Sequence, residues 1–147
     1  MELIILLCHF FFCAFMTGLI WLIQRVHYPS FAYVQDNKFA EFSHFHTKSI
    51  SQIVMPMMIL EIASAFILVS YRPSSIFILN AFLNILIFVS TFSFSVPLHQ
   101  KLVHGKNDFY ITRLVKTNWY RTILWSIRSL MLLVYLITTE GLSHPSF

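Results

Sequence analysis

Four long apolar stretches separated by short polar segments constrain this chain more than any other feature. They cover residues 3–23, 50–69, 75–96 and 119–138. Each is close to the length of about 20 residues that an α-helix needs to cross the hydrocarbon core of a bilayer. The strands of a membrane β-barrel would instead show short segments of alternating polarity. The sequence therefore predicts an all-α integral membrane four-helix bundle with an up-down-up-down arrangement.

Composition agrees with this fold class. Of the 147 residues, 57% are hydrophobic and 11% are charged. A soluble domain of this size has too little interior to bury so much apolar surface. No internal repeat is visible, so we expect a single transmembrane domain over residues 1–147. Membrane orientation and anionic lipid headgroups explain the formal net charge of +4 without a nucleic-acid partner.

Prolines mark the predicted ends and bends of the spans. The first span is expected to leave the helix at residues 27–29, because proline disfavours helix in the residue before it. The third is expected to end at Pro97, and Pro56 predicts a kink within the second. Amphipathic helical extensions are predicted on the cytoplasmic side before spans two and four. They are predicted to begin at Asp36 or Asn37 and at Phe109.

Basic residues gather on one side of the predicted bundle. Four spans place both termini together and put residues 25–48 and 99–116 on the opposite side. That opposite side carries seven basic residues, whereas Arg72 is the basic residue of the terminal side. The positive-inside rule then makes the loop side cytoplasmic and both termini external.

Two charged residues lie deep inside predicted spans. Glu61 is ten residues from Tyr71, and Arg128 is ten residues from Thr138. At about 1.5 Å per residue, each lies roughly 15 Å from the external boundary. Because a charge inside a span is costly, we predict an intramembrane ion pair between Glu61 and Arg128, with Asn84 near the same depth. A structural lock and a proton-handling or ligand-binding role both stay open for this pair.

Histidines concentrate at the predicted cytoplasmic ends of the spans. Imidazole with carboxylate suits iron, zinc, copper or nickel, and two facing imidazoles suit haem. Interfacial histidines that hydrogen-bond to lipid headgroups are the other interpretation. The cofactor is therefore open between none, a non-haem metal and haem. The candidate metal ligands are His27, His44, His46, His99 and Glu41.

A polar pocket is predicted at the same end. Asn118, Arg121 and Trp125 share a helical face at spacings of three or four residues. A histidine beside them could act as a ligand or general base on a lipophilic substrate such as a quinone or polyketide. The candidate catalytic residues are His46, His99 and Arg121. The candidate ligand-pocket residues are His27, Tyr28, Asn118, Trp119 and Trp125.

Three segments of the chain resemble a known group of proteins. They are HYPSF, then FAEFSHFHTKSI with MPMMILE, and finally VPLHQKL followed by NWYRTILWSIR. Together they resemble small, mostly uncharacterised bacterial four-helix membrane proteins and, more distantly, anthrone-oxygenase-like membrane proteins. The resemblance extends over residues 21–128. Its main positions are Tyr28, Pro29, His46, Pro56, Glu61, Pro97, His99, Asn118, Trp119, Arg121 and Arg128.

The resemblance implies a four-helix bundle in a bacterial inner membrane, with both termini on the periplasmic side by the charge rule. The more distant likeness implies oxygen chemistry on an aromatic substrate. Members of the group often have His or Tyr directly after the phenylalanine that corresponds to Phe42. This chain has Ser43 at that position, followed by His44. The choice between His44 and His46 as the functional histidine is therefore open.

Three functions are compatible with these patterns. The first is a membrane-embedded enzyme or oxidoreductase that takes a lipophilic substrate from the bilayer, with or without a metal or haem. The second is a small transporter or proton pathway that uses Glu61 and Arg128. It would have to form a homo-oligomer, since one four-span chain lacks the repeat pair usual in transporters. The third is a non-catalytic accessory subunit of a larger membrane complex. No Walker, glycine-rich nucleotide or nucleophile-elbow motif is present in the sequence.

Overall fold

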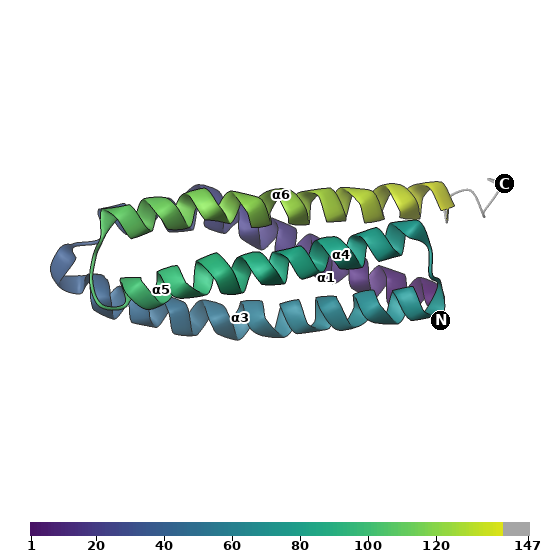
Figure 1. Ribbon diagram of the computed structural model, residues 1–147, viewed down its shortest axis with the longest axis horizontal. Coiled ribbons are helices and arrows are strands. Elements are labelled where there is room, and N and C mark those ends of the chain that lie inside the picture. Colours follow the sequence, from purple (N-terminus) through teal and green to yellow (C-terminus); the bar gives the residue numbers. More distant parts are fainter. Residues whose placement is uncertain (140–147) are drawn as a thin grey trace.

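The computed structural model describes residues 1–139, and all regular structure in that range is helical. Its long helices are α1 (Glu2–Leu22), α3 (Asp36–Tyr71), α4 (Ser75–Ser90), α5 (Val96–Leu102) and α6 (Asp108–Thr139). Figure 1 shows them side by side as an elongated four-helix bundle. The predicted all-α four-helix fold is confirmed. Residues 140–147 of the predicted domain lie outside the described range.

The helices form four continuous rods, each long and apolar enough to cross a bilayer. Large apolar side chains cover the outside of the bundle. Phe11 and Leu130, for example, are 60% and 62% exposed. Lipid tails are as apolar as these side chains, so such a surface suits a bilayer. The chain is therefore a polytopic membrane protein. The first to fourth rods are Glu2–Tyr33, Asp36–Tyr71, Ser75–Leu102 and Asp108–Thr139.

Successive rods are antiparallel, and the described chain begins and ends at the same end of the bundle (Figure 1). Contacts at that end agree with this arrangement, since Arg72 after α3 lies 3.1 Å from Glu2 at the start of α1. The first rod packs against the second and fourth, and the third rod packs against the same two. The opposite end, which holds the connections between the first two and last two rods, is called the loop end below. That it faces the cytoplasm stays a prediction.

Two π-helical turns replace the helix ends that were predicted at Pro29 and Pro97. The turns Ile23–His27 and Thr91–Ser95 each end two residues before a proline. Proline lacks an N–H donor, and its ring clashes with the carbonyl four residues earlier in a regular α-helix. That carbonyl belongs to the wider π turn in both rods, where the helical hydrogen-bond ladder is already interrupted. Both rods therefore continue past their proline, and the predicted ends are wrong.

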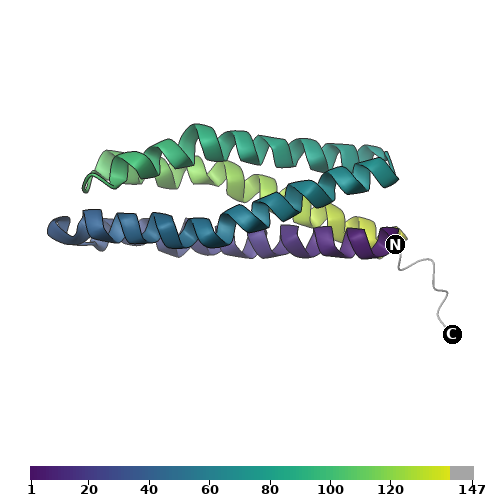
Figure 2. The same ribbon diagram turned by 90° about the horizontal axis from the view of Figure 1, so that it is seen from below.

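The remaining boundaries follow the same logic. After the first π turn, α2 (Tyr28–Ser30) and the 3-10 turn Phe31–Tyr33 complete the first rod. Figure 2 shows that α3 bends near its middle, and α3 contains Pro56, in agreement with the predicted kink. α3 begins at Asp36, one of the two predicted starts, and its N-cap residue Gln35 makes no side-chain cap hydrogen bond. Asp36 pairs with Lys106 at 3.2 Å.

Candidate functional site

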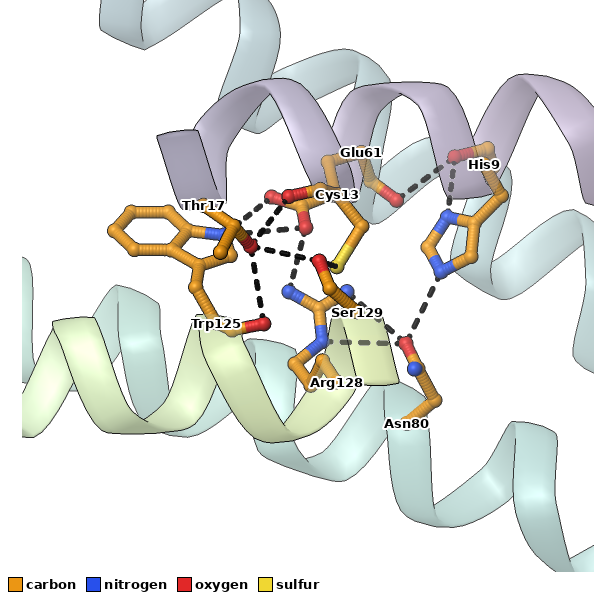
Figure 3. Close-up of polar contacts among 9 residues, drawn as sticks. His9, Cys13, Thr17, Glu61, Asn80, Trp125, Arg128 and Ser129 are labelled. Carbon is orange, nitrogen blue, oxygen red and sulfur yellow. Dashed lines mark hydrogen bonds and ion pairs between the residues drawn. The ribbon is translucent and has the colours of Figure 1, made fainter. Parts of the chain in front are cut away.

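Glu61 of α3 and Arg128 of α6 meet in the interior of the bundle (Figure 3). Glu61 Oε1 lies 2.6 Å from Arg128 Nη1, and both side chains are fully buried. Trp125, nearly one turn before Arg128, donates its indole N–H to the carboxylate, with distances of 3.2 and 3.1 Å to the two oxygens. The two charges that were matched by depth in the sequence are therefore in direct contact.

Asn80, rather than Asn84, is the amide that contacts this pair. Asn80 Oδ1 accepts hydrogen bonds from Arg128 Nε at 3.2 Å and Nη2 at 3.0 Å. The same oxygen lies 3.0 Å from His9 Nε2, and His9 Nδ1 lies 2.8 Å from the Ser64 hydroxyl. Asn84 is buried one turn along α4, and within residues 1–139 its amide has no hydrogen-bond partner. Asn84 was predicted beside the pair because it lies at a similar depth when residues are counted from the membrane boundary. That count includes neither the tilt of the helices nor the length of the arginine side chain.

This ion-pair network, defined as Glu61, Arg128, Trp125, Asn80, His9 and Ser64, connects all four rods. His9 comes from the first rod and Asn80 from the third, while the second and fourth contribute two residues each. Thr17 adds a link between α1 and α6, with its hydroxyl 2.7 Å from that of Ser129. Figure 3 shows the network in the interior between the helices. Its arrangement suits a lock that holds the four rods in one register.

A second polar cluster lies toward the loop end. We call Tyr28 of α2, His99 of α5 and Arg121 of α6 the Tyr28 cluster. Tyr28 Oη lies 3.0 Å from His99 Nε2 and 3.3 Å from Arg121 Nη2. Arg121 Nη2 also donates to Asn118 Oδ1, and the Asn118 amide N–H donates to Gln24 Oε1 at 2.8 Å. All five side chains are buried.

The π turns bring Tyr28 and His99 into this cluster. Tyr28 directly follows the first turn, and His99 lies four residues after the second. A π turn contains one extra residue, so the side chains that follow it are rotated about the helix axis relative to a regular helix. Each turn also directs polar residues to the interior, since Gln24, Thr91 and Ser95 are buried.

His27 and His46 form a hydrogen-bonded pair beside the Tyr28 cluster. His27 Nε2 lies 2.7 Å from His46 Nδ1. The ring centroids of His46 and His99 are 5.2 Å apart, and Phe31 packs edge-on against His46. Three of the predicted histidines, each from a different rod, therefore lie together.

The predicted metal site does not form. Glu41 and His44 are exposed on α3, and Glu41 lies 3.6 Å from Lys38. The helix turns them away from His46, which is buried. Among residues 1–139, no group of three or more His, Cys, Asp or Glu side chains could hold a metal ion.

The same geometry disfavours a haem between the two paired histidines. The facing nitrogens of His27 and His46 bind each other directly, which leaves no space for an iron between them. The predicted redox role stays a prediction.

An apolar cavity of about 250 Å³ adjoins the Tyr28 cluster. All three residues of the cluster line it, together with apolar side chains from the four rods. Ser51 and Met55 of α3 and Gln100 of α5 line it as well and are exposed on the outside of the bundle. The cavity therefore opens between α3 and α5. The remaining lining residues are Met16, Leu19, Ile20, Ile23, Thr47, Ile50, Val54, Thr91, Ser95, Val96, Val103 and Trp125.

Three residues that line the cavity have a buried polar atom without a partner in the described part of the chain. These atoms are Thr47 Oγ1, His99 Nδ1 and Arg121 Nε. Buried polar atoms in folded proteins are nearly always hydrogen-bonded, and exceptions call for an explanation. The residues that line the cavity therefore have hydrogen-bonding capacity that the described part of the chain does not use.

The two predicted pocket tryptophans have different surroundings. Trp125 lines the cavity while its N–H contacts Glu61, so it connects the cavity with the ion-pair network. Trp119 is not among the residues that line the cavity and packs edge-on against Trp21, with ring centroids 5.6 Å apart. His27 lies on another groove, between α1 and α3, which His46 also lines.

Asn80 and Thr47 were not predicted as site residues from the sequence. The spacing of Asn80 one turn before Asn84 could have identified it. Thr47 directly follows His46 in the sequence and gave no signal of its own.

Comparisons of the chain with protein-family models, with curated proteins and with solved structures found no match. The resemblance noted in the sequence stays an expectation.

Proposed function

We propose that this protein binds a lipophilic small molecule within the bilayer, in the cavity between α3 and α5. The observation that carries the proposal is the combination of an apolar-walled cavity with the polar Tyr28 cluster. Apolar walls with a few precisely placed polar groups are typical of small-molecule sites. Because the cavity opens on the outer surface of the bundle, a molecule dissolved in the membrane can enter it sideways.

The physics of the bilayer gives the polar residues the main role in selectivity. A molecule that leaves lipid for an apolar cavity gains little hydrophobic free energy, since lipid tails are as apolar as the cavity walls. Hydrogen bonds are stronger in this low-dielectric interior than in water. Binding is therefore expected to depend on the group that reaches Tyr28, His99 and Arg121.

Filling the cavity tests this proposal. Val54 lines the cavity on α3, whereas Ile59 lies further along the same helix and is 55% exposed. Val54→Trp should block the cavity, and Ile59→Trp is the matched control that adds the same ring on the outer surface. Each protein is purified in mild detergent, and the bound small molecules are identified by mass spectrometry. A molecule retained by the wild type and Ile59→Trp but lost from Val54→Trp supports the proposal; equal retention by all three contradicts it.

The Tyr28–His99 contact favours a second candidate function, proton transfer on the bound molecule. A tyrosine that passes its proton to His99 Nε2, 3.0 Å away, develops negative charge on its oxygen. Arg121 Nη2, 3.3 Å from that oxygen, is placed to stabilise the charge. We propose Tyr28 as the general acid or base, with His99 as its proton partner and Arg121 as the electrostatic stabiliser. His46 contacts this group through the ring of His99.

Two tyrosine variants test this chemistry even though the substrate is unidentified. Tyr28→Phe removes the reactive hydroxyl, whereas Tyr33→Phe removes one from a side chain that is 89% exposed. Lipid extracts of cells that express each variant are compared by untargeted mass spectrometry. A precursor that accumulates only with Tyr28→Phe supports catalysis. Identical extracts from wild type and Tyr28→Phe would contradict the proposed proton transfer and leave only the proposed ligand binding.

A further inference from the structure

We infer that the molecule bound in this cavity carries a carboxylate head, as a fatty acid does, and that its tail leaves between α3 and α5. The inference rests on the proposed ligand binding and names the chemistry of the same site. It follows from an uncompensated buried charge, from unused hydrogen-bond donors and from the size of the cavity.

Arg121 holds a buried positive charge without an acidic partner in the part of the chain that the structure describes. Arg121 is 5% exposed. Its guanidinium donates hydrogen bonds to two neutral groups, the Tyr28 hydroxyl and the Asn118 amide oxygen. The four ion pairs among residues 1–139 involve other cations. Arg128, by contrast, has Glu61 at 2.6 Å. Because an unpaired buried charge is strongly destabilising, an anion beside Arg121 would complete the site.

The unused polar atoms of the residues that line the cavity are mainly donors. Arg121 Nε carries one N–H and cannot accept a hydrogen bond. The Tyr28 oxygen accepts from Arg121, so its own proton is directed to His99 Nε2. A neutral His99 then carries its proton on Nδ1, which is buried and unpartnered within residues 1–139. The Thr47 hydroxyl is a third group that can donate.

These properties select among oxygen-containing ligands. A quinone carbonyl accepts hydrogen bonds but leaves the guanidinium charge unpaired. An alcohol also brings no charge and carries a proton of its own. A two-chain phospholipid is too bulky for a cavity of about 250 Å³. A carboxylate matches the N–H donors and the charge together, and a guanidinium binds it with charge-assisted hydrogen bonds. A single alkyl chain can continue from the cavity past Met55 and Gln100 into the lipid.

The test uses two photoactivatable probes of equal chain length, a diazirine-bearing palmitic acid and the corresponding hexadecanol. The protein is reconstituted in lipid nanodiscs, and labelled peptides are mapped by mass spectrometry. Arg121→Gln removes the buried charge. Arg113→Gln, on an exposed position of the same helix, is the control that removes an equal charge. Arg121→Lys retains a positive charge, and circular dichroism melting checks that each variant is folded.

We expect the acid probe to label segments 47–55 and 91–103 of the wild type and of Arg113→Gln. The alcohol probe should label them about tenfold less, the size of effect that loss of one charge-assisted interaction produces. Arg121→Gln should lose the acid labelling by a similar factor, and Arg121→Lys should recover part of it.

Equal labelling by the acid and the alcohol in the wild type would overturn the carboxylate assignment and leave ligand binding intact. Acid labelling that persists in a folded Arg121→Gln variant would also overturn the carboxylate assignment. So would a single-chain phosphate monoester that displaces the acid probe at a concentration far below that at which palmitate displaces it. If neither probe labels the cavity and Val54→Trp has no effect on bound molecules, the proposed function fails as well.

Discussion

Replacing Glu61 with leucine is expected to lower the free energy of unfolding of the bundle by about 3–5 kcal/mol. The variant leaves the Arg128 guanidinium fully buried, with the Asn80 oxygen as its remaining contact from the network. It also leaves the Trp125 indole N–H without its carboxylate acceptor. Arg128→Leu is expected to cost a similar amount, because it strands the carboxylate in the same interior.

The double variant separates the value of the pair from the cost of breaking it. Glu61→Leu with Arg128→Leu removes both charges and leaves mainly the Trp125 N–H unpaired. Asn80 keeps its contact with His9. One unpaired buried donor costs about 1–3 kcal/mol, so the double variant should be less destabilised than either single variant or equal to it. The sum of the singles would be about 6–10 kcal/mol, which predicts a coupling of at least about 3 kcal/mol.

Reversible unfolding in mixed detergent micelles, followed by circular dichroism, measures each corner of this cycle. The control cycle uses Lys38 and Glu41, whose side chains are 69% and 80% exposed, and should show a coupling of no more than about 0.5 kcal/mol. Hydrogen-bonded pairs inside membrane proteins average about 0.6 kcal/mol of coupling. A coupling energy near that average for Glu61 and Arg128 would refute the reasoning, since the pair would then contribute no more than an ordinary interhelical hydrogen bond.

Four further predictions concern the ion-pair network, the cavity and the orientation of the chain in the membrane. Asn80→Leu should lower the free energy of unfolding by about 1–3 kcal/mol, because it removes the acceptor for Arg128. Asn84→Leu should be neutral or stabilising in the same unfolding assay, because the Asn84 amide has no partner within residues 1–139; equal losses would contradict the assignment. Trp125→Phe removes the indole N–H that contacts Glu61 and should cost about 1–3 kcal/mol, but it keeps an aromatic ring at the cavity wall, so bound molecules should be retained in a mass-spectrometric assay; their loss would contradict this expectation. Single cysteines at His104 and Ser75 should react with a membrane-impermeant maleimide from the cytoplasmic and external sides respectively; the reverse pattern would invert the predicted orientation.

Hydrophobic length alone was sufficient to predict the four rods, but not where two of them end. Reading Pro29 and Pro97 as helix ends is correct for most helices in water. In these rods each proline follows a π turn, and the neighbouring helices and the bilayer favour continued helix. Proline is compatible with either outcome, because it can end a helix or follow an interrupted turn, so its position alone did not predict the π turns.

The candidate site could be predicted in part, and each failure has a physical reason. Depth counting paired Glu61 with Arg128, yet it could not identify Asn80, because depth depends on helix tilt. The choice between His44 and His46 depended on which face of α3 is internal. Phenylalanine is a poor guide to that face in a membrane, since Phe45 is 67% exposed. The buried stripe of this segment runs through Phe39, Ser43 and His46, whereas Glu41 and His44 are exposed, so neither phenylalanine nor polarity identifies the internal face.

The paired π turns imply that the fold and the site can be separated by deletions. A π turn contains one residue more than a turn of regular α-helix. Removing one residue from 91–95 would return this segment to the α-helical register, in which Pro97 kinks a helix that still crosses the bilayer. Everything beyond the deletion would rotate by about 100° relative to the preceding segment, and His99 would turn away from Tyr28. A one-residue deletion in 23–27 would turn Tyr28 away in the same manner. Length variation at these two positions among natural homologues would therefore distinguish chains that keep the polar cluster from chains that keep only the bundle.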